Sequence, residues 1–592
     1  MRASQHYLTS ILICSVLVSA IGARPSSTRA LSLEPVTPKA DTLPQSPTVA
    51  PEPQAPSAPA VNVIYVNSSA DTSPCDSGVW TLRCAIDFAD SAIDVTDIRF
   101  TVYTVVLSDS LPTITHAGTW IDGVNGSNTV IRPLIDGSQL PFSIFTGYNI
   151  FTIAADDVTI SNLQMINGAY NGNNVEISSG KNVAIAHNDL GIQADSSACP
   201  ALSGGSDGVY IPRNSAGTSA VNVAYIYGNT ISCHGGAGVE IRDATVSVGL
   251  DRNGSAVGNY IGTTDDGRHA AANHTQGVYV GKSSSTWITV TIANNTISGN
   301  SQYGIYLAGN GTDNTTICDN IIGLNYYTNT LPYAVPNGLG GVDVIGAANT
   351  RFGSCQALAL QQSAKVDPSS LIIGQSGNII AGNLGPGLHL RSASQTSLDG
   401  DSIGGNSLAL SLGFTQDCIG NQEQGILLDG DTHDSALYPA AVACNGGAGV
   451  ATAGQAISET NNLVAPTVIA FNSSLPIDRA NDGVTRLNYP TIELVNTATI
   501  TPVISGHACG ACEVYLYAAI GDPGAAGGGG IKIGHATSSL SGYWEIQASP
   551  AITRVVPALS LAGFSAFSTD IAGSLYEMRP RPQVFLPLAL KH

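Results

Sequence analysis

A short pattern recurs along most of this chain: a glycine followed by an apolar, a variable and a second apolar residue. Successive glycines of this pattern lie 30, 39, 27, 37, 46 and 38 residues apart. Units of this length cannot bury an apolar face alone, so they must stack on one another. The copies are GVYI (208–211), GVEI (238–241), GVYV (277–280), GIYL (304–307), GVDV (341–344), GLHL (387–390) and GILL (425–428).

A second pattern accompanies the first, in which an asparagine is followed by aliphatic residues and then by a further Asn or Gly. Examples are NTISGN (295–300) and NIIAGN (378–383). The runs have the two-residue period of β-strands, without helical periodicity. Gly and Asn tolerate the left-handed backbone that a corner between strands requires. The sequence therefore predicts an all-β chain wound as a parallel β-helix.

A β-propeller or a series of Ig-like domains are the alternatives. A propeller needs four antiparallel strands in each period of about 40 residues, whereas the runs here are separated by six residues or fewer. The 27-residue spacing corresponds to one coil, and the longer spacings imply inserted loops. The corner asparagines are expected to form a stacked hydrogen-bonding ladder rather than a site. They are Asn229, Asn295, Asn300, Asn378 and Asn383.

Residues 60–480 resemble the right-handed parallel β-helix, pectate-lyase-like family of exported bacterial proteins. The resemblance rests on stretches such as GNYIGTTDDG (258–267) and ANNTISGN (293–300). Residues 61–100 resemble the CSLREA-type region that precedes such repeats, with Thr81 and Cys84 where that region usually shows Ser and Glu. The last residues, VFLPLALK (584–591), are similar to a tail of exported Chloroflexi-type proteins. The resemblance implies the fold and no single activity, because this fold hosts lyases, hydrolases and adhesins alike.

The ends of the chain indicate export. An apolar run from Leu8 to Ile21 is followed by small residues, as in a secretory signal peptide, and is too short to span a bilayer. Nine prolines in residues 24–60 indicate an extended linker. After residue 487 the repeats stop and longer alternating runs suit a small Ig-like β-sandwich. The predicted parts are a signal peptide (1–23), a Pro-rich linker (24–60), a β-helix with a CSLREA-like cap (61–487), an Ig-like sandwich (488–578) and a tail (579–592).

The chain has eleven cysteines, and Cys14 lies within the predicted signal peptide. The ten that remain suit disulfides in an oxidising compartment. Cys509 and Cys512 have the spacing of a redox pair, but no helix follows them, so we expect a structural disulfide. Pairing of nearest neighbours gives Cys75–Cys84, Cys199–Cys233, Cys318–Cys355, Cys418–Cys444 and Cys509–Cys512.

The low content of charged residues and the negative net charge limit the classes of partner that the chain can bind. Charged residues make up 11% of the chain and the formal net charge is −20. A nucleic-acid-binding protein carries a basic surface, and none is visible here. Phosphate-binding loops, zinc-binding helix motifs and serine-nucleophile motifs are also missing from the sequence. We therefore expect a secreted or cell-surface protein without a transmembrane span, whose partner is a polysaccharide or a cell-surface glycan.

One row of outward-facing residues is the candidate ligand-binding site. The residue two positions after each repeat glycine points outward, and these residues stack at about 4.8 Å on successive coils. Aromatic rings beside acids suit sugars, which offer apolar faces and hydroxyl rims. The alternative is that tyrosine simply suits exposed strands and stacks on its neighbours. The candidates are Tyr210, Glu240, Tyr279, Tyr306, Asp343 and His389.

Catalysis by this row is disfavoured. Glycosidases hold two carboxyl groups about 5–9.5 Å apart, whereas Glu240 and Asp343 are three coils, or roughly 14 Å, apart. His234 falls where other repeats have Asn300 or Asn383, so we interpret it as a corner residue. Acids from loops could still converge. The candidate catalytic residues are Asp207, Glu240, Arg242, Asp265 and Asp266.

Calcium is the one cofactor that the sequence suggests. Two stretches, LDGDTHD (428–434) and IDRANDG (477–483), match the calcium-loop pattern in part. Ordinary turn chemistry explains the same residues. The candidate ligands are Asp429, Asp431, Asp434, Asp478, Asn481 and Asp482.

Three functions are therefore compatible with the sequence. The first is a secreted or cell-surface β-helix that binds glycans or mediates adhesion without catalysis. The second is a polysaccharide lyase or glycoside hydrolase whose acids come from inserted loops. The third is a structural protein of the envelope or a stalk.

Overall fold

The protein is represented by a computed structural model. Residues 1–60 and 570–592 lie outside its described part, and with them the predicted signal peptide, linker and tail. The structure describes residues 61–72, 78–143, 147–194, 196, 198–200, 205–212, 223–281, 289–309, 312–325, 332–356, 358, 377–405, 418–453, 462–479, 491–496, 503–508, 510–511, 513–520, 529–547 and 564–569.

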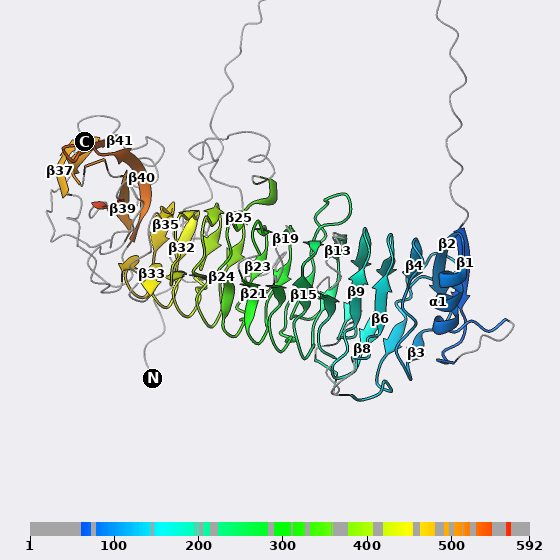
Figure 1. Ribbon diagram of the computed structural model, residues 1–592. Helices are drawn as coiled ribbons and strands as arrows, with labels where there is room; N and C mark the ends of the chain where they lie inside the picture. The colour runs from blue at the N-terminus through cyan, green and yellow to red at the C-terminus, as the bar shows by residue number, and fades with distance from the viewer. Residues whose placement is uncertain are drawn as a thin grey trace, which may run out of the picture. The chain divides into compact units, whose positions relative to one another are not determined.

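The chain is a parallel β-helix, as predicted (Figure 1). From β4 onward the strands enter three sheets in rotation, and we call one such set of three strands a rung. Sheet A contains β1 (Val61–Val66), β2 (Val95–Phe100), β4 (Thr119–Asp122), β7 (Thr159–Ser161), β10 (Val183–Ala186), β13 (Val223–Tyr227), β16 (Thr245–Val248), β19 (Val290–Ala293), β22 (Thr316–Cys318), β25 (Arg351–Gly353), β28 (Ser397–Asp399), β31 (Ala436–Tyr438) and β34 (Leu463–Val464).

The other two sheets of the β-helix follow the same order. Sheet B begins with β3 (Thr104–Val106), β5 (Leu134–Asp136), β8 (Gln164–Ile166), β11 (Asp189–Leu190), β14 (Thr230–Ile231), β17 (Tyr260–Ile261), β20 (Thr296–Ile297), β23 (Ile321–Ile322), β26 (Ile379–Ile380), β29 (Ser402–Ile403), β32 (Ala441–Ala443) and β35 (Val468–Ala470). Sheet C contains β6 (Phe151–Ala154), β9 (Val175–Ser179), β12 (Val209–Ile211), β15 (Val239–Arg242), β18 (Val278–Gly281), β21 (Tyr303–Ala308), β24 (Gly340–Ile345), β27 (Leu388–Arg391), β30 (Ile426–Asp429), β33 (Val450–Ala453) and β36 (Ile477–Arg479).

The apolar residues of the repeat form one continuous core. In sheet C the two apolar residues after each glycine, such as Val239 and Ile241, point inward and have no exposed surface. Parallel register places Val239 beside Val278 and Ile241 beside Val280. Burial of each such side chain contributes about 1.5–3 kcal/mol. The period of two therefore decides which residues remain outside.

Two ladders of buried asparagines hold the corners, as predicted for the five corner asparagines. In the first ladder, Oδ1 of each member accepts hydrogen bonds from the backbone N–H and Nδ2 of the member one rung earlier. Its members are Asn188, Asn229, Asn259, Asn295, Asn320, Asn378 and, at its end, Asp401. The second ladder contains His234, Asn273, Asn300, Asn337, Asn383, Asn421, Asn445 and Asn472.

His234 is a corner residue, as the sequence comparison of the repeats indicated. Its Nδ1 lies 2.9 Å from Oδ1 of Asn273, in the place of an asparagine amide. Burial lowers the pKa of His234 to about 4, so the imidazole is neutral at physiological pH. His234 therefore belongs to the ladder.

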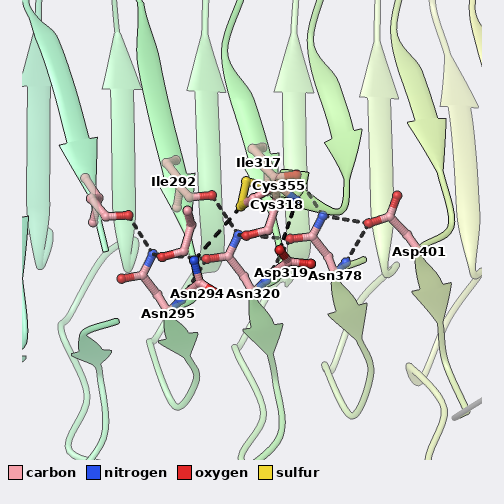
Figure 2. The surroundings of a disulfide bond; sticks show 12 residues. Ile292, Asn294, Asn295, Ile317, Cys318, Asp319, Asn320, Cys355, Asn378 and Asp401 are labelled. Atoms are coloured by element: carbon pink, nitrogen blue, oxygen red, sulfur yellow. Dashed lines mark hydrogen bonds between the residues drawn. A yellow bond between two sulfur atoms is a disulfide. The ribbon is translucent and has the colours of Figure 1, made fainter. Parts of the chain in front are cut away.

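Three predicted disulfides are confirmed: Cys199–Cys233, Cys318–Cys355 and Cys418–Cys444, with Cα–Cα distances of 5.4, 5.1 and 5.9 Å. Figure 2 shows Cys318 and Cys355 beside the first ladder. Cys84 is also disulfide-bonded. Its predicted partner Cys75, and the predicted Cys509–Cys512 pair, lie outside the described residues.

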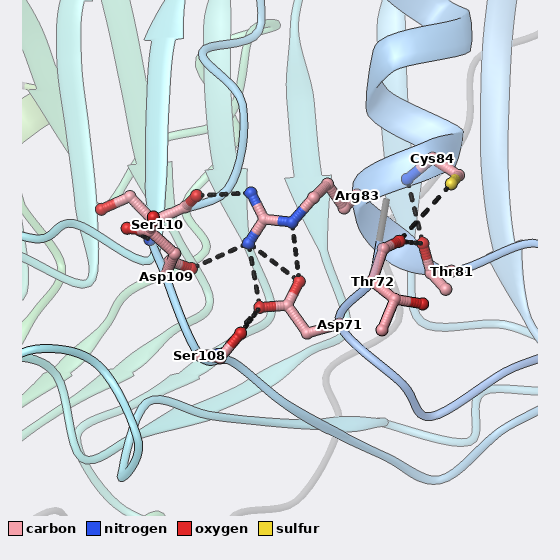
Figure 3. Close-up of polar contacts among 8 residues, drawn as sticks. All are labelled: Asp71, Thr72, Thr81, Arg83, Cys84, Ser108, Asp109 and Ser110. Carbon is pink, nitrogen blue, oxygen red and sulfur yellow. Dashed lines mark hydrogen bonds and ion pairs between the residues drawn. The ribbon is translucent and has the colours of Figure 1, made fainter. Parts of the chain in front are cut away.

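A helix covers the N-terminal end of the solenoid. The buried face of α1 (Leu82–Ser91) contributes Leu82 and Ile86 to the same core as β1 and β2. Arg83 anchors the preceding loop through an ion pair with Asp71, at 2.8 Å, and a hydrogen bond of 2.7 Å to the carbonyl of Ser110 (Figure 3). The assignment of this region as a CSLREA-type cap stays a prediction.

Replacing Thr81 with alanine is expected to lower the free energy of unfolding by about 1 kcal/mol. Thr81 is the N-cap of α1, and its Oγ1 accepts a hydrogen bond of 3.1 Å from the backbone N–H of Cys84. Urea unfolding of the purified variant checks this, with Thr81→Ser as the control that keeps the hydroxyl. Equal stability of the alanine and serine variants would contradict the role of the cap.

Antiparallel strands follow the last rung. β40 (Gly529–Thr537) pairs antiparallel with β35 and extends sheet B through β39 (Glu513–Ile520) and β42 (Phe564–Thr569). Sheet D contains β37 (Thr491–Asn496), β38 (Val503–His507) and β41 (Tyr543–Gln547). Both sheets contribute to one small core around Trp544. The edge of β35 is thus covered, which protects it from pairing with another chain. The Ig-like assignment stays a prediction.

Within the part of the chain that is described, no helix is both long enough and apolar enough to cross a membrane.

Candidate functional site

The strand register brings the predicted row of residues into one column on the outer face of sheet C. Parallel pairing places them on successive rungs in the order Tyr210, Glu240, Tyr279, Tyr306, Asp343 and His389. We call the outward residues here the sheet C face; with their neighbours they are Glu176, Tyr210, Glu240, Arg242, Tyr279, Tyr303, Tyr306, Asp343, His389, Arg391 and Asp429.

The tyrosine rings of this face stack on one another. The centroids of Tyr279 and Tyr306 lie 5.6 Å apart with an interplanar angle of 26°, and those of Tyr303 and Tyr306 lie 5.8 Å apart at 27°. On Tyr279, Cζ of Arg242 lies 4.2 Å from the ring centroid, a cation–π contact. The neighbours therefore occupy the ring faces, and flat stacking of a sugar on them, the basis of the sequence prediction, is not favoured.

Glycine at position 281 makes room for the Arg242 contact. A Cβ on Gly281 would come within 2.7 Å of both the Tyr279 ring and the guanidinium of Arg242. With that space free, Arg242 lies over Tyr279 and its Nε donates to Oε1 of Glu240 at 2.8 Å. Arg242 thus joins a carboxylate and an aromatic ring on adjacent rungs.

Asp343 is the most deeply buried polar group of the face. Its side chain has no exposed surface, and Arg391 pairs with both carboxylate oxygens. The hydrogen bond to Asp343 raises the pKa of Arg391. Burial and then the charge of Asp343 raise the pKa of Tyr303 to about 12, so its phenol stays neutral. A buried charge requires such a partner, because it has lost its hydration.

His389 lies between two carboxylates. Its Nδ1 is 3.8 Å from Asp343 Oδ1, and its Nε2 is 3.6 Å from Asp429 Oδ2. Burial lowers the pKa of His389, and this effect is larger than the opposite effect of the two acids, which raise it. His389 is therefore neutral at physiological pH.

Of the predicted catalytic residues, Asp207, Glu240 and Arg242 lie together. Asp207 is 5% exposed and accepts a hydrogen bond of 2.7 Å from the backbone N–H of Ala237. Burial, and then the charge of Glu240, raise the pKa of Asp207 to about 7. This corner is thus the place on the face where an acid could hold a proton at neutral pH.

Asp265 and Asp266 are not part of this corner. Both lie in the turn after β17 of sheet B, where Asp266 accepts hydrogen bonds from Thr264 Oγ1 at 2.6 Å and Arg268 N at 3.0 Å. The sequence analysis named Asp265 and Asp266 because they are acidic residues in a predicted loop. The sequence does not show which sheet that loop adjoins. The hydrogen bonds of Asp266 are those of a turn.

The spacing of Glu240 and Asp343 agrees with the sequence expectation. Register places Tyr279 and Tyr306 between them, so they are three rungs, or roughly 14 Å, apart. Two carboxyl groups of a glycosidase must lie within about 9.5 Å. This pair therefore cannot hydrolyse a glycosidic bond.

The first calcium candidates serve other contacts. Asp429 accepts the backbone N–H of Gly430 at 2.7 Å and faces His389, while Asp434 accepts His433 Nδ1 at 2.8 Å. In the described ranges, no group of three His, Cys, Asp or Glu side chains could hold a metal. Asp431 lies on the same turn, and Asp478 lies on β36; Asn481 and Asp482 fall outside the described residues. Calcium stays a prediction.

The residues predicted as a site did not include three members of this face, Glu176, Tyr303 and Arg391, and Asp429 was predicted only as a calcium ligand. Arg391 follows His389 by two residues, and Asp429 follows Leu427 by two, so the alternation along each strand predicts that both point outward. The sequence does not reveal the ion pairs that they form. Tyr303 precedes a repeat glycine and pairs with Gly340, where a Cβ would come within 3.0 Å of the Tyr303 ring. A bulky residue that pairs with a glycine on the next strand is the sequence feature that could have identified Tyr303.

No protein-family model and no curated protein matches the chain. Among solved structures it is similar to the Dettilon tailspike protein gp208, with 13% identity, 77% of this chain and 78% of that chain covered, and a TM-score of 0.37. It is also similar to the A-module of mannuronan C-5 epimerase AlgE6 from Azotobacter vinelandii, with 14% identity, 68% of this chain and 89% of that chain covered, and a TM-score of 0.35. A third similar structure is a variant of the periplasmic alginate epimerase AlgG, with 14% identity, 66% of this chain and 70% of that chain covered, and a TM-score of 0.34. Similarity at this level says nothing about ligand or activity.

Proposed function

We propose that this protein is a secreted or cell-surface β-helix that binds a polysaccharide or cell-surface glycan along the sheet C face. The observation that carries the proposal is the column of hydroxyl, carboxylate and guanidinium groups, which continues rung after rung from Tyr210 to Arg391. A repeating array of donors and acceptors suits a repeating polymer of sugars. Disulfides at the corners support an oxidising, extracellular compartment.

The groups of the face are held in place before any ligand arrives. Arg242 is fixed between Glu240 and Tyr279, and Arg391 is fixed by Asp343. Preorganised side chains lose little conformational entropy on binding, which favours affinity. Tyr210, Tyr279 and Tyr306 are partly exposed, and each carries a hydroxyl that can donate and accept.

Polysaccharide cleavage is the alternative, and Asp207 is the observation in its favour. A carboxyl group whose pKa is raised to about 7 beside a second carboxylate is typical of a general acid. Against this, Glu240 is paired with Arg242, and Asp207 is almost fully buried. Binding without cleavage agrees better with these contacts. A purely structural stalk would use the ion pairs and the stacked rings for stability alone, and the binding experiment below distinguishes it from the proposal.

Replacing both Tyr279 and Tyr306 with phenylalanine is expected to weaken glycan binding by about 10-fold or more, since two hydroxyl groups each contribute about 1 kcal/mol. Phenylalanine preserves the stacked rings, so thermal unfolding should change little. Affinity electrophoresis of the purified chain through gels that contain polysaccharides measures the effect.

Tyr103→Phe is the matched control, because Tyr103 is 71% exposed and lies at sheet B. Its binding should equal that of the unaltered chain. If the double phenylalanine variant binds as well as the control, the hydroxyl edges are not the recognition groups and the proposal for this face fails.

A further inference from the structure

The charges of the sheet C face are already paired with one another. Nε of Arg242 bonds Glu240 at 2.8 Å, and Arg391 holds both oxygens of Asp343. Within the described part of the face, these two arginines are the permanently charged cations. Each faces a carboxylate of its own, so the charge of each arginine is already offset before a ligand arrives.

The remaining acids of the face make its charge negative. Glu176 accepts a hydrogen bond of 2.8 Å from Nδ2 of Asn149, and Asp429 accepts the N–H of Gly430. Neither has an arginine or lysine within ion-pair distance in the described residues. His389, beside Asp429, is kept neutral by burial, which lowers its pKa. The chain as a whole carries a formal charge of −20.

An acidic polysaccharide would meet this surface unfavourably. Recognition of a carboxylate usually relies on an unshielded arginine or lysine, most effectively by two parallel hydrogen bonds from one guanidinium. Release of Arg391 for that purpose would leave Asp343 buried and unpaired, which is strongly destabilising. The negative potential would also slow the approach of a polyanion.

Neutral hydroxyl groups are what the face still offers. The phenols of Tyr210 and Tyr306 have pKa values raised first by burial, so both remain uncharged hydroxyls. With Tyr279 they lie on the same column as the paired ions, and a phenol both donates and accepts. Sugar hydroxyls have the same double capacity.

We infer that the ligand of the sheet C face is a neutral polysaccharide, one without uronate, sulfate or phosphate groups. The inference rests on the proposed glycan-binding function and specifies its ligand class. Recognition occurs through hydrogen bonds between sugar hydroxyls and the tyrosine edges, while the internal ion pairs stay intact.

Affinity electrophoresis of the purified full chain tests the inference, with neutral polymers (a β-glucan, a galactomannan) and acidic polymers (polygalacturonate, alginate) in parallel gels at low and high salt. We expect retardation by a neutral polymer, unchanged by salt, with binding at least 10-fold weaker to both acidic polymers. The Tyr279→Phe/Tyr306→Phe variant should lose the retardation by the neutral polymer, whereas Tyr103→Phe should keep it.

Two other outcomes separate the ligand class from the function. If an acidic polymer retards the chain as strongly as a neutral one, and the double phenylalanine variant loses that retardation, the ligand-class inference is overturned and glycan binding at this face stands. If no polymer of either class retards the chain, the proposed function itself fails, and the inference fails with it.

Discussion

Replacing Asn320 with alanine is expected to lower the free energy of unfolding by about 3–5 kcal/mol, because two buried backbone groups lose their partners and each such loss costs about 1–3 kcal/mol. Asn320 is 1% exposed. Its Oδ1 accepts the backbone N–H and Nδ2 of Asn295, each at 3.0 Å. Its Nδ2 donates to the carbonyl of Ile292 at 2.8 Å and to Asn378 Oδ1 at 2.9 Å (Figure 2).

Alanine at this position would leave the buried backbone N–H of Asn295 without its acceptor and the carbonyl of Ile292 without the Asn320 donor. Nδ2 of Asn295 would lose one acceptor and keep the carbonyls of Val248 and Ala293. Urea unfolding followed by circular dichroism measures the change, and Asn253→Ala is the control because Asn253 is exposed in a turn. The control should stay within about 0.5 kcal/mol of the unaltered chain. A loss below about 1 kcal/mol for Asn320→Ala would contradict the structural importance of the ladder.

Replacing Asp401 with asparagine is expected to stabilise the protein at alkaline pH. Asp401 ends the first ladder, where its Oδ1 accepts the N–H and Nδ2 of Asn378 at 2.7 and 2.6 Å. The other carboxyl oxygen is buried without a hydrogen-bond partner in the described structure. In the other members of this ladder an amide nitrogen stands at that position. Burial, the largest influence, raises the pKa of Asp401 to about 8.

The direction of the pH dependence follows from this pKa. The folded chain keeps the proton of Asp401 up to a pH of about 8, whereas the unfolded chain loses it near the ordinary aspartate pKa of 3.8. The contribution of this group to stability is therefore present below a pH of about 4 and is lost as pH rises towards 8. Asparagine does not titrate and avoids this loss.

We expect the stability difference between Asp401→Asn and the unaltered chain to change in favour of the variant by about 5 kcal/mol between pH 4 and pH 8, since the pKa of Asp401 is raised from 3.8 to about 8. Urea unfolding at a series of pH values from acid to mildly alkaline measures it. Asp94→Asn is the control, since Asp94 is exposed on the surface. A difference for Asp401→Asn that does not change with pH would show that the carboxyl group is not protonated in the folded state.

The repeat made the fold and the register of the face predictable. The glycine marks the start of each sheet C strand, and strict alternation then decides that Tyr279 points outward while Val278 and Val280 are buried. The recurrence of asparagine at one position of each rung likewise predicted the ladders, because identical amides on adjacent rungs can bond to each other. Both deductions need only a fixed period.

The contacts within the face were not predictable in the same way. Whether Tyr306 presents its ring face or its edge to solvent depends on Tyr279, on the adjacent strand β18, and on Tyr303, at the start of the same strand. The pairing of Arg391 with Asp343 joins residues 48 positions apart and requires knowledge of both side-chain conformations. Likewise, the antiparallel pairing of β40 with β35 depends on how residues after the repeats fold back. No periodic pattern encodes such choices.

Release of reducing ends tests the central claim, glycan binding without cleavage, most directly. The purified chain is incubated with each polysaccharide that retards it in affinity electrophoresis, and new reducing ends are counted against a blank without protein. Hydrolases and lyases both create reducing ends, so one assay covers both chemistries. The account predicts that polymers which bind the sheet C face show no release above the blank. Release that is abolished by Asp207→Asn would contradict it and would identify the corner of Asp207 and Glu240 as a catalytic site.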